Sequence, residues 1–394
     1  ITMKDDVKEM DEVVVTGYGN IKKESFTGSS ISVKREDLLK ASATNVVQAL
    51  STFDPSFRIQ QNNKWGSDPN AIPEIYIRGR SGIGVKELDK DALSKSSLKN
   101  NPNLPIFIMD GFEVSVQKVY DMDPNRIASI TILKDAAATA MYGSRASNGV
   151  IVVETVTPEL GKLQVAYSFN ASLTVPDLSD YNLMNAEEKL QAELLSGLYD
   201  LSTANGMTAY VMKKNYITKG VDTDWMSQPL QNQFNHSHSL YISGGTEGFR
   251  FGTDLSYNHE GGVMKKSYRN RMSVGIYVDY RVGKLQIRNN VSYDLARSSD
   301  SPYGSFSDYT KQQPYYPIYD DNGKLLQMLA IGIPNPLYEA TLGNFSRGES
   351  SNLTNNLSFY WFINDHLQLQ SQFSVTKNDS EDKDFTDPLS TKYG

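Results

Sequence analysis

Few side chains in this sequence could carry out chemistry. Its 394 residues include no cysteine, which excludes thiol catalysis, disulfide scaffolds and cysteine-ligated metal centres together. His236 and His238 would share one face of a strand and could bind a metal ion jointly, but no third ligand is evident. The run Asp121–Asn125 begins like a calcium loop, yet Arg126 stands where that loop requires glycine. We therefore expect neither a metal ion nor a cofactor.

Catalytic signatures are missing as well. The sequence has no glycine-rich phosphate loop and no nucleophile elbow, and its carboxylates are too scattered to nominate a glycosidase pair. Asp320–Gly323 is a typical hairpin-turn sequence. With 39 Lys and Arg against 46 Asp and Glu, the net charge is −7 and no long basic run occurs. We expect a protein that is not an enzyme and does not bind nucleic acid.

The elements that would position functional side chains change character near residue 160. Upstream, short apolar strands such as 74–78 and 127–133 alternate with helical pieces such as 44–50. Downstream, apolar and polar residues alternate with a period of two, which is typical of strands with one apolar face. Seven such segments follow one another, at 163–175, 238–244, 249–257, 268–280, 285–295, 353–363 and 367–375.

Alternation alone fits both a soluble sandwich and a membrane barrel, but the lengths and connections of these strands favour a barrel. Most strands run about nine residues or more, as a tilted membrane-crossing strand needs. Short turns near 245–248, 283 and 364–365 alternate with longer loops, as in outer-membrane barrels. No apolar run is long enough for a transmembrane helix, and charged residues interrupt any N-terminal signal sequence. Because barrels have an even strand number, seven strands predict a chain that is cut at its C-terminus.

Several short motifs accompany these elements. Asp11–Gly19 is a β-prone stretch that fits either a strand added to the sheet edge of another protein or the first strand of a soluble domain. Asp110-Gly111 is a hairpin-turn dipeptide, and Gly143 and Gly149 bracket a tight connection. The further motifs are Glu74–Gly79, Pro105–Gly111, Asp123–Ala136, Tyr142–Ile151, Thr223–Trp225 and Ser243–Thr246.

In this order the motifs resemble the SusC/RagA-type TonB-dependent transporters of Gram-negative Bacteroidota. The resemblance implies an α+β plug domain followed by antiparallel transmembrane β-barrel strands. About seven of roughly 22 strands would be present, because a 22-stranded barrel encloses a plug. It divides the chain into the end of an N-terminal extension (1–10), a TonB box (11–19), a plug domain (20–160) and the first part of the barrel with long extracellular loops (161–394).

The same resemblance implies TonB-dependent active import of a bulky nutrient, an oligosaccharide or an oligopeptide, across the outer membrane. The implied partners are TonB on the periplasmic side, a SusD-like surface lipoprotein as a lid, the substrate and outer-membrane lipid. A dimer of transporter–lipoprotein pairs is compatible with it. The competing hypotheses are a soluble or surface-attached β-rich protein that binds glycans or peptides without transport and, third, a carbohydrate-active enzyme.

The resemblance also assigns residues. TonB binding falls on Asp11, Glu12, Val13, Val14, Val15 and Thr16. The plug-motif residues are Arg78, Gly79, Asp110, Gly111, Lys134, Tyr142, Gly143, Arg145, Asn148 and Gly149. Aromatic residues are candidate substrate contacts, although those in the long loop after residue 297 could instead pack that loop: Trp65, Tyr303, Phe306, Tyr309, Tyr315, Tyr316 and Tyr319.

Charged residues of a plug inside a barrel would need partners on the barrel wall. Our hypothesis is that some of these pairs latch the plug, the alternative being that water in the barrel solvates the charges. The plug residues considered are Arg78, Arg80, Glu113, Lys134 and Arg145, and the inward-facing barrel residues are Arg250, Asp254, Arg269 and Asp279.

Overall fold

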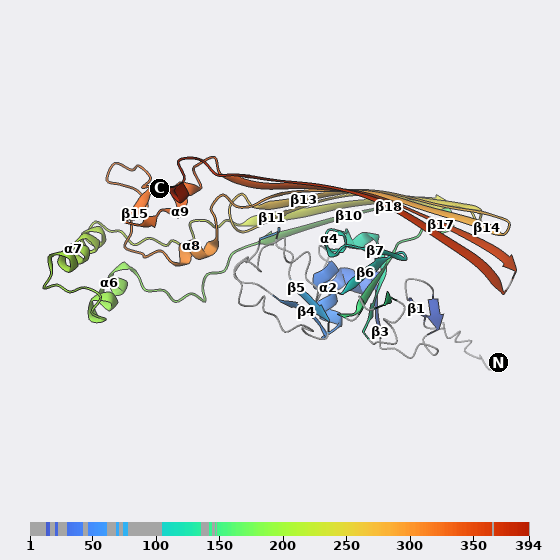
Figure 1. Cartoon of the computed structure of the whole chain (residues 1–394), viewed down its shortest axis with the longest axis horizontal. Coiled ribbons are helices and arrows are strands. Elements are labelled where there is room, and N and C mark those ends of the chain that lie inside the picture. Colours follow the sequence, from blue (N-terminus) through green and yellow to red (C-terminus); the bar gives the residue numbers. More distant parts are fainter. Residues whose placement is uncertain are drawn as a thin grey trace, which may run out of the picture.

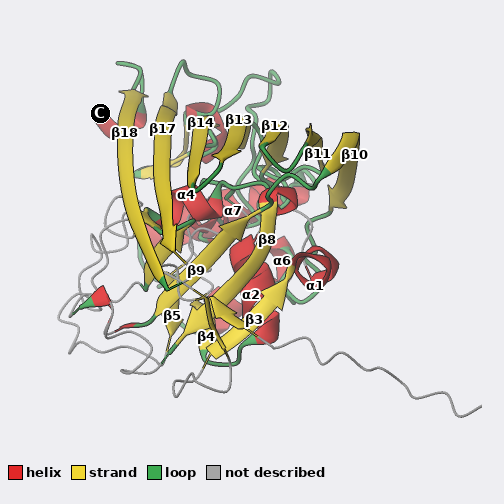
Figure 2. Cartoon of the chain, turned by 90° about the vertical axis from the view of Figure 1, so that its right-hand side faces the viewer, coloured by secondary structure: helices red, strands yellow, loops and turns green. Residues whose placement is uncertain are grey.

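The computed structural model has a small N-terminal unit and a long curved sheet that lies along one side of it (Figures 1 and 2). The structure describes residues 13–15, 20–22, 30–41, 46–60, 68–70, 74–77, 105–134, 142–143, 146, 148–364 and 366–393. None of the helices among these residues is long and apolar enough to span a membrane.

The N-terminal unit is built on a five-stranded sheet in the order β3-β8-β9-β6-β7. Its strands are β3 (Ser30–Lys34), β6 (Ile106–Met109), β7 (Phe112–Val114), β8 (Ile127–Leu133) and β9 (Val150–Thr155). All neighbours are antiparallel except β6 and β9. Helices α1 (Arg35–Ala41), α2 (Val46–Phe53) and α4 (Val116–Tyr120) and the 3-10 turn η4 (Pro124–Arg126) accompany it. Two small hairpins complete the unit, β1 (Val13–Val15) with β2 (Asn20–Lys22) and β4 (Phe57–Gln60) with β5 (Glu74–Ile77).

Burial on both faces explains why the central strands read as continuous apolar runs. In β9, Ile151 and Val153 belong to one hydrophobic core together with residues of α1, α2 and α4, while Val150 and Val152 belong to a second. The Asp110-Gly111 turn joins β6 to β7 with positive φ at both residues, 51° and 89°. Asp110 also accepts hydrogen bonds from the Thr155 amide and hydroxyl, which ties this turn to the end of β9.

The second part is an antiparallel meander of seven strands in the order β10-β11-β12-β13-β14-β17-β18. This confirms the predicted plug-like α+β unit followed by seven barrel-type strands. The sheet is not closed, because its edge strands β10 and β18 do not pair with each other. The strands are β10 (Gly161–Thr174), β11 (Gln233–Gly245), β12 (Phe249–Gly261), β13 (Tyr268–Val282), β14 (Leu285–Ser299), β17 (Phe345–Asn364) and β18 (Leu367–Phe385). Most extend beyond the predicted segments, because cross-strand pairing continues past the alternating stretch, for example to Ser299↔Arg347.

The predicted alternation sorts side chains between the two faces of this sheet. On β13, Arg269, Arg271 and Ser273 are buried and face the N-terminal unit. The neighbouring Met272 and Ile276 point outward and are about half exposed, at 47% and 51%. The outer face is therefore apolar and the inner face polar, as a strand in a membrane barrel requires.

Two long connections lie at the same end of the sheet, at the left of Figure 1. Residues 175–232 carry α6 (Ala186–Leu195) and α7 (Ala204–Thr218). Residues 300–344 carry α8 (Phe306–Thr310), β15 (Met328–Ala330), β16 (Ile333–Pro334) and α9 (Pro336–Glu339). The short 3-10 turn η7 (Thr391–Tyr393) follows β18. The turns at 246–248 and 283–284 lie at the opposite end, which matches the predicted alternation of short and long connections.

Candidate functional site

Residues 115–126 of the N-terminal unit, which we call the latch segment, form ion pairs with the seven-stranded sheet, which we call the wall. Asn70 also contacts the end of the wall, where its Nδ2 donates to the Ser299 carbonyl at 3.0 Å. The segment contains α4 and η4. Ser115 Oγ accepts a hydrogen bond from the Lys118 amide at the start of α4, and Asp123 caps η4 by accepting from the Asn125 amide. Val119 and Met122 are buried in the core. Anchored in this way, the segment presents Lys118, Asp121 and Arg126 to the wall.

Lys118 reaches three wall residues on two strands. Its Nζ lies 2.9 Å from Asp294 Oδ2 and 3.0 Å from Ser292 Oγ on β14, and 3.4 Å from Thr354 Oγ1 on β17. The side chain is 9% exposed. Because a buried ammonium needs acceptors for its protons, these three oxygens hold Lys118 against the wall.

Asp121 binds two arginines of β13. Its carboxylate accepts two hydrogen bonds from Arg269, at 3.0 Å from Nε and 2.7 Å from Nη2, which is the bidentate geometry that suits a guanidinium. Arg271 Nη1 lies 3.6 Å from Asp121 and donates to the Tyr120 carbonyl at 3.1 Å. Arg271 Nη2 donates to Glu260 on β12 at 2.7 Å. Arg271 is therefore paired on both sides of the interface, and Arg269 is paired with Asp121 of the latch segment.

Arg126 completes the contact. Its Nε lies 3.0 Å from Asp254 Oδ2 on β12, and its Nη1 lies 3.7 Å from Asp294 Oδ1 on β14. Asp294 is thus shared between Lys118 and Arg126. Side chains in these pairs range from 5% to 31% exposed. Removing one partner of so buried a pair leaves an uncompensated charge, which costs several kcal/mol, about 3–5.

Burial also acts on an uncharged group of the same segment. It raises the pKa of the Tyr120 phenol to about 12, with the nearby Glu260 carboxylate adding to the effect. Tyr120 therefore stays neutral at any physiological pH. Among the described residues of the latch segment, charge is therefore carried by Lys118, Asp121 and Arg126 and not by Tyr120.

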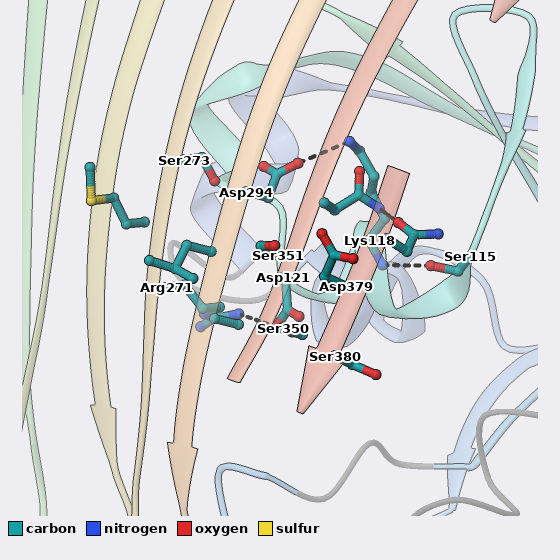
Figure 3. A pocket seen from close by; sticks show the side chains of 15 residues that line it. Ser115, Lys118, Asp121, Arg271, Ser273, Asp294, Ser350, Ser351, Asp379 and Ser380 are labelled. Carbon is teal, nitrogen blue, oxygen red and sulfur yellow. Dashed lines mark hydrogen bonds and ion pairs between the residues drawn. The ribbon is translucent and has the colours of Figure 1, made fainter. Parts of the chain in front are cut away.

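A cavity of about 230 Å³ lies beside α4. Lys118, Asp121, Arg271 and Asp294 line it, and serine and asparagine residues of β17 and β18 form its other side (Figure 3). The lining residues on β13, β14, β17 and β18 lie nearer the strand ends that carry the long connections than the ends that carry the short turns. Because Lys118 and Asp121 line the cavity, a ligand in it would contact the latch segment directly.

The structure confirms two residues of the predicted latch and contradicts two others. Asp254 and Arg269 do face the N-terminal unit and pair with it, as expected. Asp279 instead pairs within the wall, with Gln286 and Arg288. The expectation for Lys134 was wrong, since its Nζ lies 2.6 Å from Asp54 inside the N-terminal unit. The candidates Arg78, Arg80 and Arg145 lie outside the described residues.

Sequence reasoning did not assign Lys118, Asp121, Arg126, Arg271 or Asp294 to this interface. Strand parity places Arg271 and Asp294 on the inner face, so the pattern could have identified both as wall charges. Lys118, Asp121 and Arg126 carried no comparable signal, because a five-residue helix and a 3-10 turn give no reliable period. Asp121 was in fact considered only as part of a failed calcium loop. Among the described residues, no group of three histidine or acidic side chains is arranged to hold a metal ion.

Glycine conformation and hydrogen bonds help to fix the backbone of the predicted plug motifs. Gly143 and Gly149 adopt positive φ, 71° and 96°, where glycine is favoured. The Gly149 carbonyl accepts from the Ile106 amide at 3.1 Å. Burial raises the pKa of the Asp110 carboxyl, against the lowering effect of its hydrogen bonds from Thr155. Of the other predicted motif residues, Tyr142 and Asn148 are described, whereas Arg78, Gly79 and Arg145 are not.

The predicted TonB-binding strand is described only at its centre. Val13–Val15 form β1, which pairs antiparallel with β2 in the register Val13↔Lys22, Val14↔Ile21 and Val15↔Asn20. Asp11, Glu12 and Thr16 lie outside the described residues, as does Trp65.

Three of the candidate substrate contacts are buried. Tyr309, Tyr315 and Tyr316 are 0%, 1% and 5% exposed and pack with Trp225 and Leu190 of the other long connection. No ring surface is left for a ligand, so the expectation that they contact substrate is corrected in favour of loop packing. Tyr303 and Phe306 are half-buried, and Tyr319 is 55% exposed.

A buried charge joins the two long connections. Glu193 on α6 accepts hydrogen bonds from the Tyr199 hydroxyl and, at 3.0 Å, from the Tyr315 hydroxyl, while Lys213 of α7 donates to both phenols. Burial alone would raise the pKa of Glu193, but these hydrogen bonds and the nearby Lys213 outweigh it and lower the pKa. The two connections are therefore held together by an ionised carboxylate.

Comparison with known proteins places this arrangement in context. A family model described as the TonB-dependent Receptor Plug Domain matches residues 22–150. The chain is similar to the TonB-dependent receptor SusC of Bacteroides thetaiotaomicron, with 30% identity over 288 residues that cover 70% of this chain and 25% of that protein. It is also similar to TonB-dependent receptor P3 of Formosa agariphila, with 26% identity over 395 residues that cover 97% of this chain and 35% of that protein.

Among solved structures, the RagAB peptide importer in its open-open state superimposes with a TM-score of 0.72 at 22% identity, over 94% of this chain and 42% of that chain. The unliganded ferric citrate transporter FecA superimposes with a TM-score of 0.56 at 14% identity, over 92% of this chain and 41% of that chain. At these identities the structures establish a shared fold. The chain spans 25% and 35% of the length of the two curated relatives.

Proposed function

We propose, from the premise that this chain belongs to the SusC/RagA-type TonB-dependent receptors, that the protein imports a bulky nutrient across the outer membrane of a Gram-negative bacterium. The nutrient is an oligosaccharide or an oligopeptide. Residues 20–160 act as the plug, and the wall is the first part of the barrel that surrounds it. The family's members are receptors and transporters and not enzymes.

The observation that carries this proposal is the latch segment. Three charges of one short segment hold four charges on β12, β13 and β14. Ionic contacts can exchange for water as the plug moves, whereas a dry apolar interface would lose its hydrophobic stabilisation on every displacement. The plug is therefore seated firmly and reversibly, which suits a gate that must open and reseat in each transport cycle.

TonB would act through residues 11–16. Among the described strands β1 pairs only with β2, so one edge of β1 is open to a strand from TonB. Strand addition at that edge would give main-chain hydrogen bonds that transmit a pull to the plug. Energy would come through TonB, so the protein needs no nucleotide or cofactor of its own.

On the opposite side, the two long connections form a platform for a SusD-like surface lipoprotein acting as a lid. Glu193, Tyr199 and Tyr315 lock these connections together, so the platform is one body. Trp65, Tyr303 and Phe306 remain the aromatic candidates for contact with cargo. A dimer of two transporter–lipoprotein pairs is part of the same proposal.

Deleting residues 11–16 tests the proposal in cells. Uptake of the nutrient should be lost while binding at the cell surface survives, because the deletion removes the TonB strand and leaves the plug and wall intact. A deletion of six residues within 175–181, far from β1, serves as the control for chain shortening. Unchanged uptake after the 11–16 deletion would exclude import driven by TonB through this strand. Surface binding without any uptake by the unmodified protein would favour a binding protein without transport.

A further inference from the structure

The cavity beside α4 has an unequal distribution of accessible charge. Its two cations are the most deeply buried of its charged side chains, Lys118 at 9% and Arg271 at 5% exposed, and both are already paired. Its carboxylates are paired too, Asp294 with Lys118 and Arg126 and Asp379 with Lys377, but they are more open, at 26% and 62% exposed. A ligand that enters the cavity therefore reaches its carboxylates more readily than its cations.

Apart from Met272, Leu295 and Ala296, the rest of the lining is polar and offers hydrogen bonds but no stacking surface. Ser350 and Ser380, and Asn352 and Asn378, stand opposite each other in the β17–β18 register and line the cavity in pairs. None of the lining residues is aromatic. Hydroxyl and amide oxygens are acceptors for a nitrogen cation, whereas the face of an uncharged sugar ring would find no aromatic partner here.

Asp294 is also the residue of the wall that two latch charges share. Lys118 Nζ lies 2.9 Å from one of its oxygens and Arg126 Nη1 lies 3.7 Å from the other. A cation that reaches Asp294 from the cavity must compete with Lys118 for the same carboxylate. Occupation of the cavity and the integrity of the latch are therefore linked.

We propose that this cavity is a subsite for a cationic nitrogen group of the cargo, an ammonium or a guanidinium, which binds Asp294 in competition with Lys118. The proposal rests on the proposed import function and adds a charge preference to it. Two kinds of cargo carry such a cationic group. A peptide carries it on lysine, arginine or its terminal amine, and an unacetylated amino sugar carries it on its free amine. Binding breaks the ion pair between Lys118 and Asp294, so cargo in the cavity weakens the contact between the plug and the wall.

The experiment measures equilibrium binding to the full-length protein in detergent, without TonB. The probes are trilysine and the glucosamine trisaccharide, and each is matched with its N-acetylated, uncharged form. Asp294→Asn should weaken binding of the charged probes roughly tenfold or more, the value of a hydrogen bond to a charged group. Lys118→Gln should tighten it, because Asp294 loses its competitor. Glu349→Gln, which removes an exposed carboxylate outside the cavity, should change nothing.

The opposite signs separate this role from a structural one, since mere loosening of the interface would weaken binding in both variants. Binding of one charged probe or of both supports the subsite and identifies the source. Equal binding of charged and acetylated probes, no binding of either charged probe, or weaker binding in Lys118→Gln overturns it. The comparison of charged with acetylated probes on the unmodified protein holds even if Asp294→Asn fails to fold. Loss of TonB-dependent uptake with this binding pattern intact would refute import and leave the subsite standing.

Discussion

Asp254 on β12 and Gly275 on β13 stand opposite each other in the wall, and the missing side chain of Gly275 leaves the space that the Asp254 carboxylate occupies. A Cβ atom at position 275 would clash with the Asp254 carboxylate and would lie 2.9 Å from Arg126 Nη2. An uncharged residue on one strand thus determines whether a charge on the next strand can reach the plug.

Gly275→Ala should therefore displace Asp254 from Arg126. We expect a loss of about 1–3 kcal/mol in stability from the forced shift, visible as a lower midpoint of thermal unfolding in detergent. Ser273→Ala, on the same strand and face, adds no atom and is the control. An unchanged midpoint for Gly275→Ala would show that the Asp254–Arg126 contact is dispensable.

Asp121→Asn should be the most damaging single change in the latch. It leaves Arg269 and Arg271 short of their carboxylate in a site where the side chains are 10% and 5% exposed, at a cost of about 3 kcal/mol or more. Asp37→Asn, which breaks an exposed pair with Lys40, should cost less than about 1 kcal/mol. A double-mutant cycle with Arg269→Gln measures the coupling. A coupling energy near zero would contradict the bidentate contact.

The link between the two long connections should depend on pH. Because the folded-state pKa of Glu193 is lowered, its contribution to stability is present above its ordinary value of 4.5 and is lost as the pH falls through the folded-state pKa. Hydrogen exchange in α6 should accelerate over that acidic range. Glu193→Gln should abolish this pH-dependent step, while Glu187→Gln, an exposed residue paired with Lys214, should retain it. Identical profiles for the two variants would refute the assignment.

Tyr309→Ala should destabilise the long connections rather than remove a ligand contact. Its ring is fully buried, and truncating a buried aromatic ring costs about 3 kcal/mol or more. Tyr319→Ala, at a position 55% exposed, should leave stability unchanged. The comparison is made by thermal unfolding and by cargo binding at a temperature where both variants are folded. A Tyr309→Ala protein of normal stability that has lost binding would restore the substrate-contact hypothesis.

Val14→Pro should abolish uptake. Proline has no amide hydrogen and therefore cannot donate a main-chain bond at the centre of β1, whether to β2 or to a strand added by TonB. Val14→Ile keeps the amide and should transport normally. Both are compared by nutrient uptake at equal amounts of protein in the outer membrane. Normal uptake by Val14→Pro would place TonB binding outside β1.

The sequence by itself determined the local features of this protein. A period of two is a property of neighbouring residues, so alternation was enough to predict seven strands and to place Asp254 and Arg269 on the inner face. The motifs from Asp11 to Thr246 likewise predicted the plug-like unit, and the Asp110-Gly111 turn follows from glycine's tolerance of positive φ.

Only the tertiary structure decided which charges meet. Asp121 and Arg269 are 148 residues apart, and their contact depends on how one segment of the N-terminal unit is seated along the height of the wall. No local pattern encodes that offset, so Lys134 was assigned to the wall although it pairs with Asp54. The buried tyrosines follow the same rule, because two connections distant in sequence had to pack before Tyr309 and Tyr315 could lose their exposure.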